Sequence, residues 1–225
     1  MLFAIGDVHG HFDKLMRLMR FCREFARQSS QAPRFILLGD YIDRGPDSRG
    51  VLEYLCSRPP DVSAIIGNHE DMLLQGLDDP RAADLWLQNG GYETLNSYRA
   101  SHASEIPMAH IELIRSMPVC IDDGVRLFVH AGIDPANIEG RNRQVLLWTR
   151  KHPDGRAILP RLVVHGHTPT YSRKPELLPN RLNLDTGAGW GHRLTAAAFH
   201  DDQARPIAFL NDLDERPNAV EPMRT

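Results

Sequence analysis

Five short, largely apolar runs in this sequence each end in a glycine beside a side chain that can titrate or bind a metal. With the residues that follow them, the runs are LFAIGDVHG (2–10), FILLGDYIDRG (35–45), SAIIGNHE (63–70), RLFVHAG (126–132) and RLVVHGHTP (161–169). Such runs are typical of strands buried on both faces. Because ligands bind beyond the carboxyl ends of the strands in open α/β sheets, we expect these polar ends to meet in space.

The order of the elements predicts one α/β domain over residues 1–225 with two sheets. Apolar residues at helical spacing predict a helix at about 11–27, and a second helix is expected after GPDS, capped by Asp47 or Ser48. The alternation of strands and helices early in the chain favours parallel pairing. After residue 120 the strands, including LNL (182–184) and LTAAAF (194–199), leave little room for helices, which favours antiparallel hairpins in a second sheet.

Two further segments have expected places in this domain. Residues 71–118 are mainly helical in pattern and are expected to form a cap over one edge, while the polar, Pro-containing tail 211–225 is expected to be partly disordered or to lie on the surface. Within the cap, WLQNGGYETL (86–95) has two interpretations of equal weight. It is either helix packing with a glycine break or a cap wall that touches substrate.

Composition excludes several classes of protein. A net charge of −3 provides no broad basic field, which argues against nucleic-acid binding. The three cysteines are odd in number, widely spaced and set among apolar residues, which indicates reduced thiols and a reducing compartment. No apolar stretch approaches the roughly 20 residues of a membrane span, and the N-terminus lacks a basic region and a cleavage site. We therefore expect a cytoplasmic protein without a membrane partner.

The polar side chains at the strand ends form a mixed oxygen and nitrogen set. Aspartate, asparagine and histidine ligands suit Mn, Fe or Zn better than calcium or a thiolate-bound structural zinc. Their number exceeds what one tetrahedral ion needs. A pair of ions about 3.5–4 Å apart, bridged by one carboxylate and a water, would use them all and would generate hydroxide near neutral pH.

The motifs GDVHG (6–10), GDYIDRG (39–45), GNHE (67–70), HAG (130–132) and HGHTP (165–169) resemble, in order and spacing, those of the phosphoprotein phosphatases within the calcineurin-like metallophosphoesterases. The resemblance covers roughly residues 2–199, and the small size and NGGYETLNSY (89–98) resemble the compact bacterial serine/threonine protein phosphatases. It implies a central two-sheet β-sandwich flanked by helices in four layers. It also implies two divalent metal ions, of which Mn²⁺ is preferred here over Fe or Zn.

The resemblance also implies roles for individual residues. Asp7 and His9 would bind the first ion, Asp40 would bridge, and the second ion would be held by Asn68, His130 and His167. His69 would be the general acid that protonates the leaving-group oxygen, oriented by Asp43. Arg44 would bind the phosphate, and Arg150 in LLWTR would be a second phosphate contact resting on a shorter match.

Physical chemistry supports some of these roles and leaves others open. An arginine fork matches phosphate oxygens in a bidentate way, and a histidine beside a carboxylate keeps one orientation and retains its proton. Taken alone, however, Asp7 fits an Asx turn. The residues themselves do not decide whether His165 or His167 points inward. Glu70 and Asp185 are expected to support the site through hydrogen bonds, with helix capping as the other reading for Glu70.

Three functions remain open from the sequence. The first is a metal-dependent phosphomonoesterase that removes phosphate from phosphoserine or phosphothreonine in proteins, with phosphotyrosine and phosphohistidine as further candidates, by direct attack of a metal-bridging hydroxide. The second is a hydrolase of diadenosine polyphosphates or other nucleotides; in the symmetrical dinucleotide branch of the resembled family, glutamine commonly replaces the histidine of GDVHG, which favours the first function. The third is a non-catalytic metal-bound scaffold, which would normally have lost an acid, bridge or arginine. The oligomeric state is left open.

Overall fold

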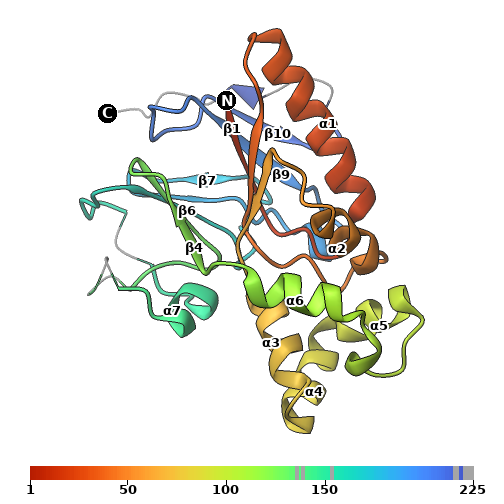
Figure 1. Ribbon diagram of the computed structural model, residues 1–225. Coiled ribbons are helices and arrows are strands. Elements are labelled where there is room, and N and C mark those ends of the chain that lie inside the picture. The colour runs from red at the N-terminus through yellow and green to blue at the C-terminus, as the bar shows by residue number, and fades with distance from the viewer. Residues whose placement is uncertain (135–136, 138–139, 153–154, 215–217, 220–225) are drawn as a thin grey trace.

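The protein is described by a computed structural model that covers residues 1–134, 137, 140–152, 155–214 and 218–219 (Figure 1). Within these residues two sheets are formed. The first has the order β11-β10-β9-β1-β2-β3 and the second β4-β5-β6-β8-β7. The strands of the first sheet are β1 (Leu2–Ile5), β2 (Arg34–Leu37), β3 (Val62–Ala64), β9 (Thr195–Phe199), β10 (Ala208–Asn211) and β11 (Asn218–Ala219). Those of the second are β4 (Cys120–Asp122), β5 (Arg126–Val129), β6 (Leu162–His165), β7 (Glu176–Leu177) and β8 (Arg181–Asn183).

The strand directions confirm the expectation for the first half of the chain and correct it for the second. β1, β2 and β3 pair in parallel, and β9 and β10 add antiparallel strands. In the second sheet, β5 pairs with β6 and β6 with β8 in parallel, so the expected antiparallel hairpins are wrong there. The segment between β5 and β6, residues 130–161, is long enough for a crossover, and its described part forms one short helix, α7 (Arg143–Trp148). Only β4 and β7 pair antiparallel to their neighbours in that sheet.

Alternation of side chains along the strands divides the core into layers. In β1, Leu2 and Ala4 join a cluster with Phe128 and Val164 from the second sheet, so this cluster lies between the sheets. Phe3 belongs instead to the cluster that includes the buried face of α1 (Phe12–Gln28). Burying such a side chain contributes about 1.5–3 kcal/mol. Because α7 covers the other face of the second sheet, the expected four-layer sandwich is confirmed.

The helices agree closely with the periodic patterns. α1 begins one residue after the predicted start, and α2 (Ser48–Cys56) is capped by Asp47, whose side chain accepts from the amide of Gly50. The segment expected to be a helical cap holds several short helices that gather at one end of the sandwich in Figure 1. They are α3 (Asn68–Gly76), α4 (Pro80–Trp86), the π-helical turn η1 (Leu87–Gly91), α5 (Tyr92–Tyr98), the 3₁₀ turn η2 (Ala103–Glu105) and α6 (Met108–Ser116).

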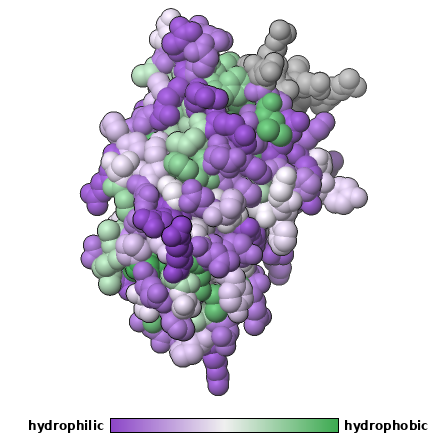
Figure 2. Space-filling model, turned by 90° about the vertical axis from the view of Figure 1, so that its right-hand side faces the viewer, coloured by the Kyte–Doolittle hydropathy of each residue, from purple (hydrophilic) through white to green (hydrophobic). Residues whose placement is uncertain are grey.

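The surface and the chain end add three observations. Figure 2 shows a face on which hydrophilic residues predominate and hydrophobic ones are interspersed among them. In the part of the chain that the structure describes, no helix is long and apolar enough to cross a membrane. Of the tail, residues 215–217 and 220–225 lie outside the described residues, while β11 pairs with β10 rather than hanging free.

Candidate metal centre and active site

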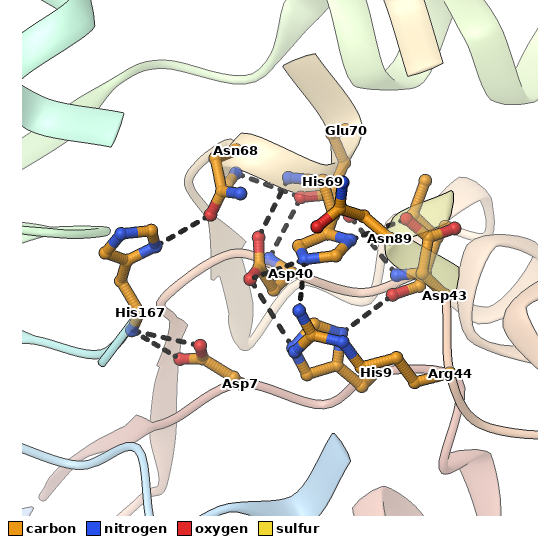
Figure 3. A network of polar contacts seen from close by, with 12 residues as sticks. Asp7, His9, Asp40, Asp43, Arg44, Asn68, His69, Glu70, Asn89 and His167 are labelled. Atoms are coloured by element: carbon orange, nitrogen blue, oxygen red, sulfur yellow. Dashed lines mark hydrogen bonds and ion pairs between the residues drawn. The ribbon is translucent and has the colours of Figure 1, made fainter. Parts of the chain in front are cut away.

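The polar residues after five different strands converge at one end of the sandwich, as expected. Asp7 and His9 follow β1, Asp40 follows β2, and Asn68 and His69 open α3 after β3. His130 and His167 follow β5 and β6. Figure 3 shows Asp40 between two groups, with His9, His69 and Arg44 on one side and Asn68 and His167 on the other. These residues are buried except Arg44 and His167, which are partly exposed. Residues separated by 160 positions therefore share one site.

Two sets of candidate ligands share Asp40. Among the described residues, the ligand atoms of His9, Asp40 and His69 lie within 4.8 Å of one another, and so do those of Asp40, His130 and His167. The Oδ2 atom of Asp40 is 3.5 Å from His9 Nε2, and its Oδ1 atom is 3.3 Å from His130 Nε2. One carboxylate therefore presents a different oxygen to each set, which is the geometry of a bridging ligand.

Two of the histidines are held in the form that binds metals. His9 Nδ1 lies 3.0 Å from the carbonyl oxygen of Ile42, and His130 Nδ1 lies 2.8 Å from that of Leu38. Because a carbonyl oxygen only accepts, each Nδ1 carries the proton, and each Nε2 presents its lone pair to the site. Burial lowers the pKa of both rings, which favours the neutral form. The donor chemistry at these positions fits a divalent transition metal.

His167, and not His165, faces the site. Its Nδ1 lies 2.8 Å from Asn68 Oδ1, the same oxygen that lies 2.8 Å from His130 Nε2. Burial, and then the charge of His130, lower the pKa of His167 to about 3. His165 instead stacks on His152 with ring centroids 4.6 Å apart. The structure thus decides the question that the residues alone left open.

Asp7 stands beside these sets without joining either of them among the described residues. Its carboxylate accepts from the amide of His167, with oxygens 3.0 and 3.2 Å from the nitrogen. Burial raises the pKa of Asp7, and the negative charges of Asp185 and Asp40 raise it further. A cation would relieve this crowding of buried carboxylates, so the residues fit a metal site.

His69 differs electrostatically from its neighbours. Its Nδ1 donates to Asp43 Oδ2 at 2.6 Å. Burial would lower the pKa of His69, but the charge of Asp40 and the hydrogen bond to Asp43 outweigh burial and raise it. Its other nitrogen, Nε2, lies 2.8 Å from Arg44 Nη2. Because a guanidinium only donates, Nε2 accepts in this arrangement, and the two hydrogen bonds hold the ring in one orientation.

The two arginines predicted to bind phosphate lie in different surroundings. Arg44 is partly exposed, its Nη1 lies 2.7 Å from His9 Nε2, and its guanidinium stacks 4.7 Å from the ring centroid of Trp190. Trp190 ends the 3₁₀ turn η3 (Ala188–Trp190) and is 60% exposed, so it stands at the mouth of the site. Arg150 is exposed. Its positive charge contributes to the lowered pKa of His167, after the larger effects of burial and of His130.

Backbone strain is concentrated at this site. Five of its residues have positive φ, in the left-handed region that side chains rarely adopt: His9 (47°), Asp40 (52°), Asp43 (73°), Arg44 (68°) and His167 (69°). Such conformations persist only where the surroundings enforce them. Glu70 provides part of that enforcement, because its carboxylate accepts from the amides of Gly67, Asp40, Tyr41 and Ile42. It both caps α3 and supports the site, as the two readings of the sequence proposed.

Sequence reasoning missed three residues that shape the site. Trp86 and Thr94 both donate to the carboxylate of Asp43, and Trp190 stacks on Arg44. A general signal existed for the first, because a buried tryptophan N–H usually finds an acceptor. The sequence offered no means of naming that acceptor, since Trp86 and Asp43 are 43 positions apart.

The two-sheet sandwich gathers buried carboxylate, amide and imidazole ligands beside an oriented histidine and an arginine. This combination is typical of a metal-dependent phosphoester hydrolase. Comparison with known proteins agrees, since residues 2–212 match the family described as calcineurin-like phosphoesterase. The chain belongs to this family, which together with the two ligand sets indicates a dinuclear site for divalent metals.

The names of the curated relatives include both protein phosphatases and dinucleoside tetraphosphatases. Serine/threonine-protein phosphatase 1 of Salmonella typhimurium is 33% identical over 213 residues, which cover 87% of this chain and 90% of that protein. The asymmetrical bis(5'-nucleosyl)-tetraphosphatase PrpE of Bacillus velezensis is 26% identical over 224 residues, covering 88% and 89%. The resemblance to bacterial serine/threonine phosphatases is thus confirmed at the level of the family.

Solved structures share the fold. One provisionally described as a diadenosine tetraphosphatase has a TM-score of 0.69 at 22% identity and covers 96% of this chain and 93% of its own. A cold-active protein-tyrosine phosphatase from a psychrophilic Shewanella species has a TM-score of 0.60 at 18% identity, covering 87% and 74%. The predicted sandwich architecture is confirmed by both.

Proposed function

We propose that this protein removes phosphate from phosphoserine and phosphothreonine side chains of proteins, with phosphotyrosine and phosphohistidine as further substrates. The observation that carries the proposal is the buried pair of Asp43 and His69, joined at 2.6 Å, with the second ring nitrogen of His69 accepting from Arg44 Nη2 at 2.8 Å. The 33% identity to a serine/threonine-protein phosphatase supports the same substrate class.

The chemistry of the leaving group explains why this pair matters. Hydrolysis of a serine or threonine phosphate expels an alkoxide, which is strongly basic and leaves only if it receives a proton. When the fork of Arg44 turns to the phosphate, the Nε2 atom of a protonated His69 would give that proton to the ester oxygen as the P–O bond breaks, while Asp43 stabilises the ring through Nδ1. A nucleotide leaving group is already stable as an anion near neutral pH and needs no such acid.

The remaining site residues have the roles that the resemblance assigns. Asp7, His9 and Asp40 would hold one divalent ion, and Asp40 with Asn68, His130 and His167 the other; we propose Mn²⁺ for both. When bound, the paired ions neutralise the phosphoryl oxygens and supply a nucleophile at neutral pH. Arg44 would take two phosphate oxygens through its fork, with Arg150 as an outer contact. Stacking on Trp190 keeps the Arg44 guanidinium in place.

A second candidate function is hydrolysis of dinucleoside polyphosphates. It is favoured by the names of several relatives that match most of the chain at 26–27% identity. The same metal ligands and the same arginine would serve that reaction, so the two candidates differ chiefly in whether His69 is needed as an acid.

A substrate panel tests the proposal. Purified protein loaded with Mn²⁺ is assayed with phosphoserine, phosphothreonine and phosphotyrosine peptides and with diadenosine tetraphosphate. We expect kcat/KM to be highest for a phosphoserine or phosphothreonine peptide and to fall by about 10²-fold or more in His69→Asn. Faster turnover of diadenosine tetraphosphate than of every phosphopeptide, unaffected by His69→Asn, would reverse the assignment.

A further inference from the structure

The segment WLQNGGYETL (86–95) contains two buried donors that meet the acid-orienting carboxylate. Trp86 ends α4 and Thr94 lies in α5, with the π-helical turn η1 between them. We propose that Trp86 and Thr94 are positioning residues for the general acid, because they fix the carboxylate of Asp43 that in turn fixes His69. This inference rests on the proposed function, in which His69 protonates the leaving group.

The carboxylate of Asp43 accepts hydrogen bonds from three side chains, those of His69, Trp86 and Thr94. Its Oδ2 accepts from His69 Nδ1 at 2.6 Å and its Oδ1 from Thr94 Oγ1 at 2.7 Å, while Trp86 Nε1 lies 3.0 Å from both oxygens. Asp43 is 0% exposed. Burial raises the pKa of Asp43, and the hydrogen bonds from His69, Thr94 and Trp86 lower it. Because Asp43 is closed off from the surface, the two donors from the cap fix how its carboxylate is rotated toward His69.

Thr94 also holds the backbone of the same residue. Its Oγ1 accepts from the amide of Asp43 at 2.9 Å and lies 3.0 Å from Ser48 Oγ, which itself accepts from that amide at 3.1 Å. The backbone of Asp43 has a φ of 73°, so the hydroxyl steadies a strained turn as well as its carboxylate. Both functions need the hydroxyl and neither needs the methyl group.

Gly90, which breaks the helix between the two donors, brings the cap into contact with the turn that carries Asp43 and Arg44. Gly90 has a φ of 111°, its carbonyl oxygen accepts from the amide of Arg44 at 3.2 Å, and a Cβ added to it would lie 2.9 Å from that amide nitrogen. The segment therefore packs directly against the turn that carries the acid-orienting and phosphate-binding residues. Of the two interpretations of WLQNGGYETL, helix packing with a glycine break is confirmed at Gly90, and the packing places the segment behind the turn that carries Asp43 and Arg44.

Isosteric variants separate positioning from packing. Trp86→Phe keeps the buried ring and removes the N–H, and Thr94→Val keeps the shape and removes the hydroxyl, while Thr94→Ser keeps the hydroxyl. Tyr98→Phe is the matched control, because it removes a partly buried hydrogen bond to His110 in the same cap without touching Asp43. Each variant is loaded with Mn²⁺, checked for metal content and folding, and assayed with a phosphoserine peptide and with an aryl phosphate whose leaving group needs no proton.

A positioning role predicts losses that depend on the leaving group. In Thr94→Val and Trp86→Phe, kcat for the phosphoserine peptide should fall about tenfold and kcat for the aryl phosphate less than about twofold, with KM unchanged. Thr94→Ser should restore most of the activity, and Tyr98→Phe should resemble the parent protein. Equal losses on both substrates, or no loss in Thr94→Val, would overturn the inference.

His69→Asn distinguishes this failure from failure of the proposed function. If His69→Asn loses far more activity on the phosphoserine peptide than on the aryl phosphate while Thr94→Val does not, the acid assignment stands and the positioning inference is wrong. If His69→Asn loses both activities equally, the acid assignment fails and the positioning inference falls with it.

Discussion

Asp40 lies buried among four histidines of the site. Burial opposes its ionisation, yet the charges of His130, His69, His9 and His167 lower its pKa well below the ordinary value. Its two oxygens face different histidines. The backbone that carries it has a φ of 52° and is held through its amide by Glu70. A single side chain thus joins the two halves of the site.

Replacing this carboxylate should therefore remove metal as well as activity. We expect Asp40→Asn to bind fewer than two ions per chain and to lose about 10²-fold or more in kcat, because an amide offers one neutral acceptor in place of two charged oxygens. Asp61→Asn, which alters a surface pair with Arg23, is the control. Metal analysis and phosphatase assays measure both. Two tightly bound ions in Asp40→Asn would refute the bridging role.

At this scale the sequence predicted the residues of the site better than their mutual arrangement. Asp7, His9 and Asp40 could be named because each follows an apolar strand beside a glycine. Trp86 and Thr94 could not, because a side chain that donates to Asp43 from a cap helix leaves no local pattern in the sequence. The inward-facing member of the HGH motif was also undecidable from the residues, since both histidines flank one glycine.

The cap helices and the turn after β2 act together as one element of the site. The backbone amide of Arg44 donates to the carbonyl oxygen of Gly90. Gly90 itself has a φ of 111°, which only glycine adopts without strain. In the proposed function, the cap would influence phosphate binding through Arg44 without contacting the phosphate itself.

Gly90→Ala should weaken substrate binding through this contact. The new methyl group would contact the backbone of Arg44, and residue 90 would keep a φ of 111° that alanine adopts only with strain. The guanidinium of Arg44 would shift as a result. A loss of about 1 kcal/mol in phosphate binding corresponds to a rise in KM of about fivefold. Gly124→Ala is the matched control, with a φ of 85° and nothing within 4 Å of the added Cβ. An unchanged KM in Gly90→Ala, measured by steady-state kinetics, would contradict the contact.

At the scale of elements, periodicity predicted α1 and the strands that carry the ligands within a residue or so. The predicted antiparallel direction of β6 and β8 was wrong. The prediction assumed that a parallel connection needs room for a long helix, whereas the connections in this sheet cross over with little regular helix. Strands β10 and β11 were missed, since their pairing at the sheet edge depends on contacts distant in sequence.

Arg126 links the two sheets of the whole molecule. It opens β5 in the second sheet, is 1% exposed, and its guanidinium donates to the carbonyl oxygens of His200, Asp201 and Gln203 in the connection between β9 and β10 of the first sheet. It also pairs with Asp123 at 2.8 Å. A buried cation thus satisfies acceptors from both layers.

Arg126→Met should lower the free energy of unfolding by about 3 kcal/mol, because it removes a buried guanidinium that donates to three partly buried carbonyl oxygens and pairs with Asp123. Arg34→Met, which removes an exposed pair with Asp201, should change it by less than about 1 kcal/mol. Chemical denaturation followed by circular dichroism measures both values. Equal stabilities for the two variants would show that Arg126 does not join the sheets.

Removal and return of metal tests whether these scattered side chains act as one dinuclear centre. The protein is stripped with a chelator and titrated with Mn²⁺ while bound metal per chain and turnover of a phosphoserine peptide are recorded together. We expect no measurable turnover in the stripped protein and full turnover only as the second ion binds. Undiminished turnover after complete chelation, or full activity with a single ion bound, would contradict the paired-metal site.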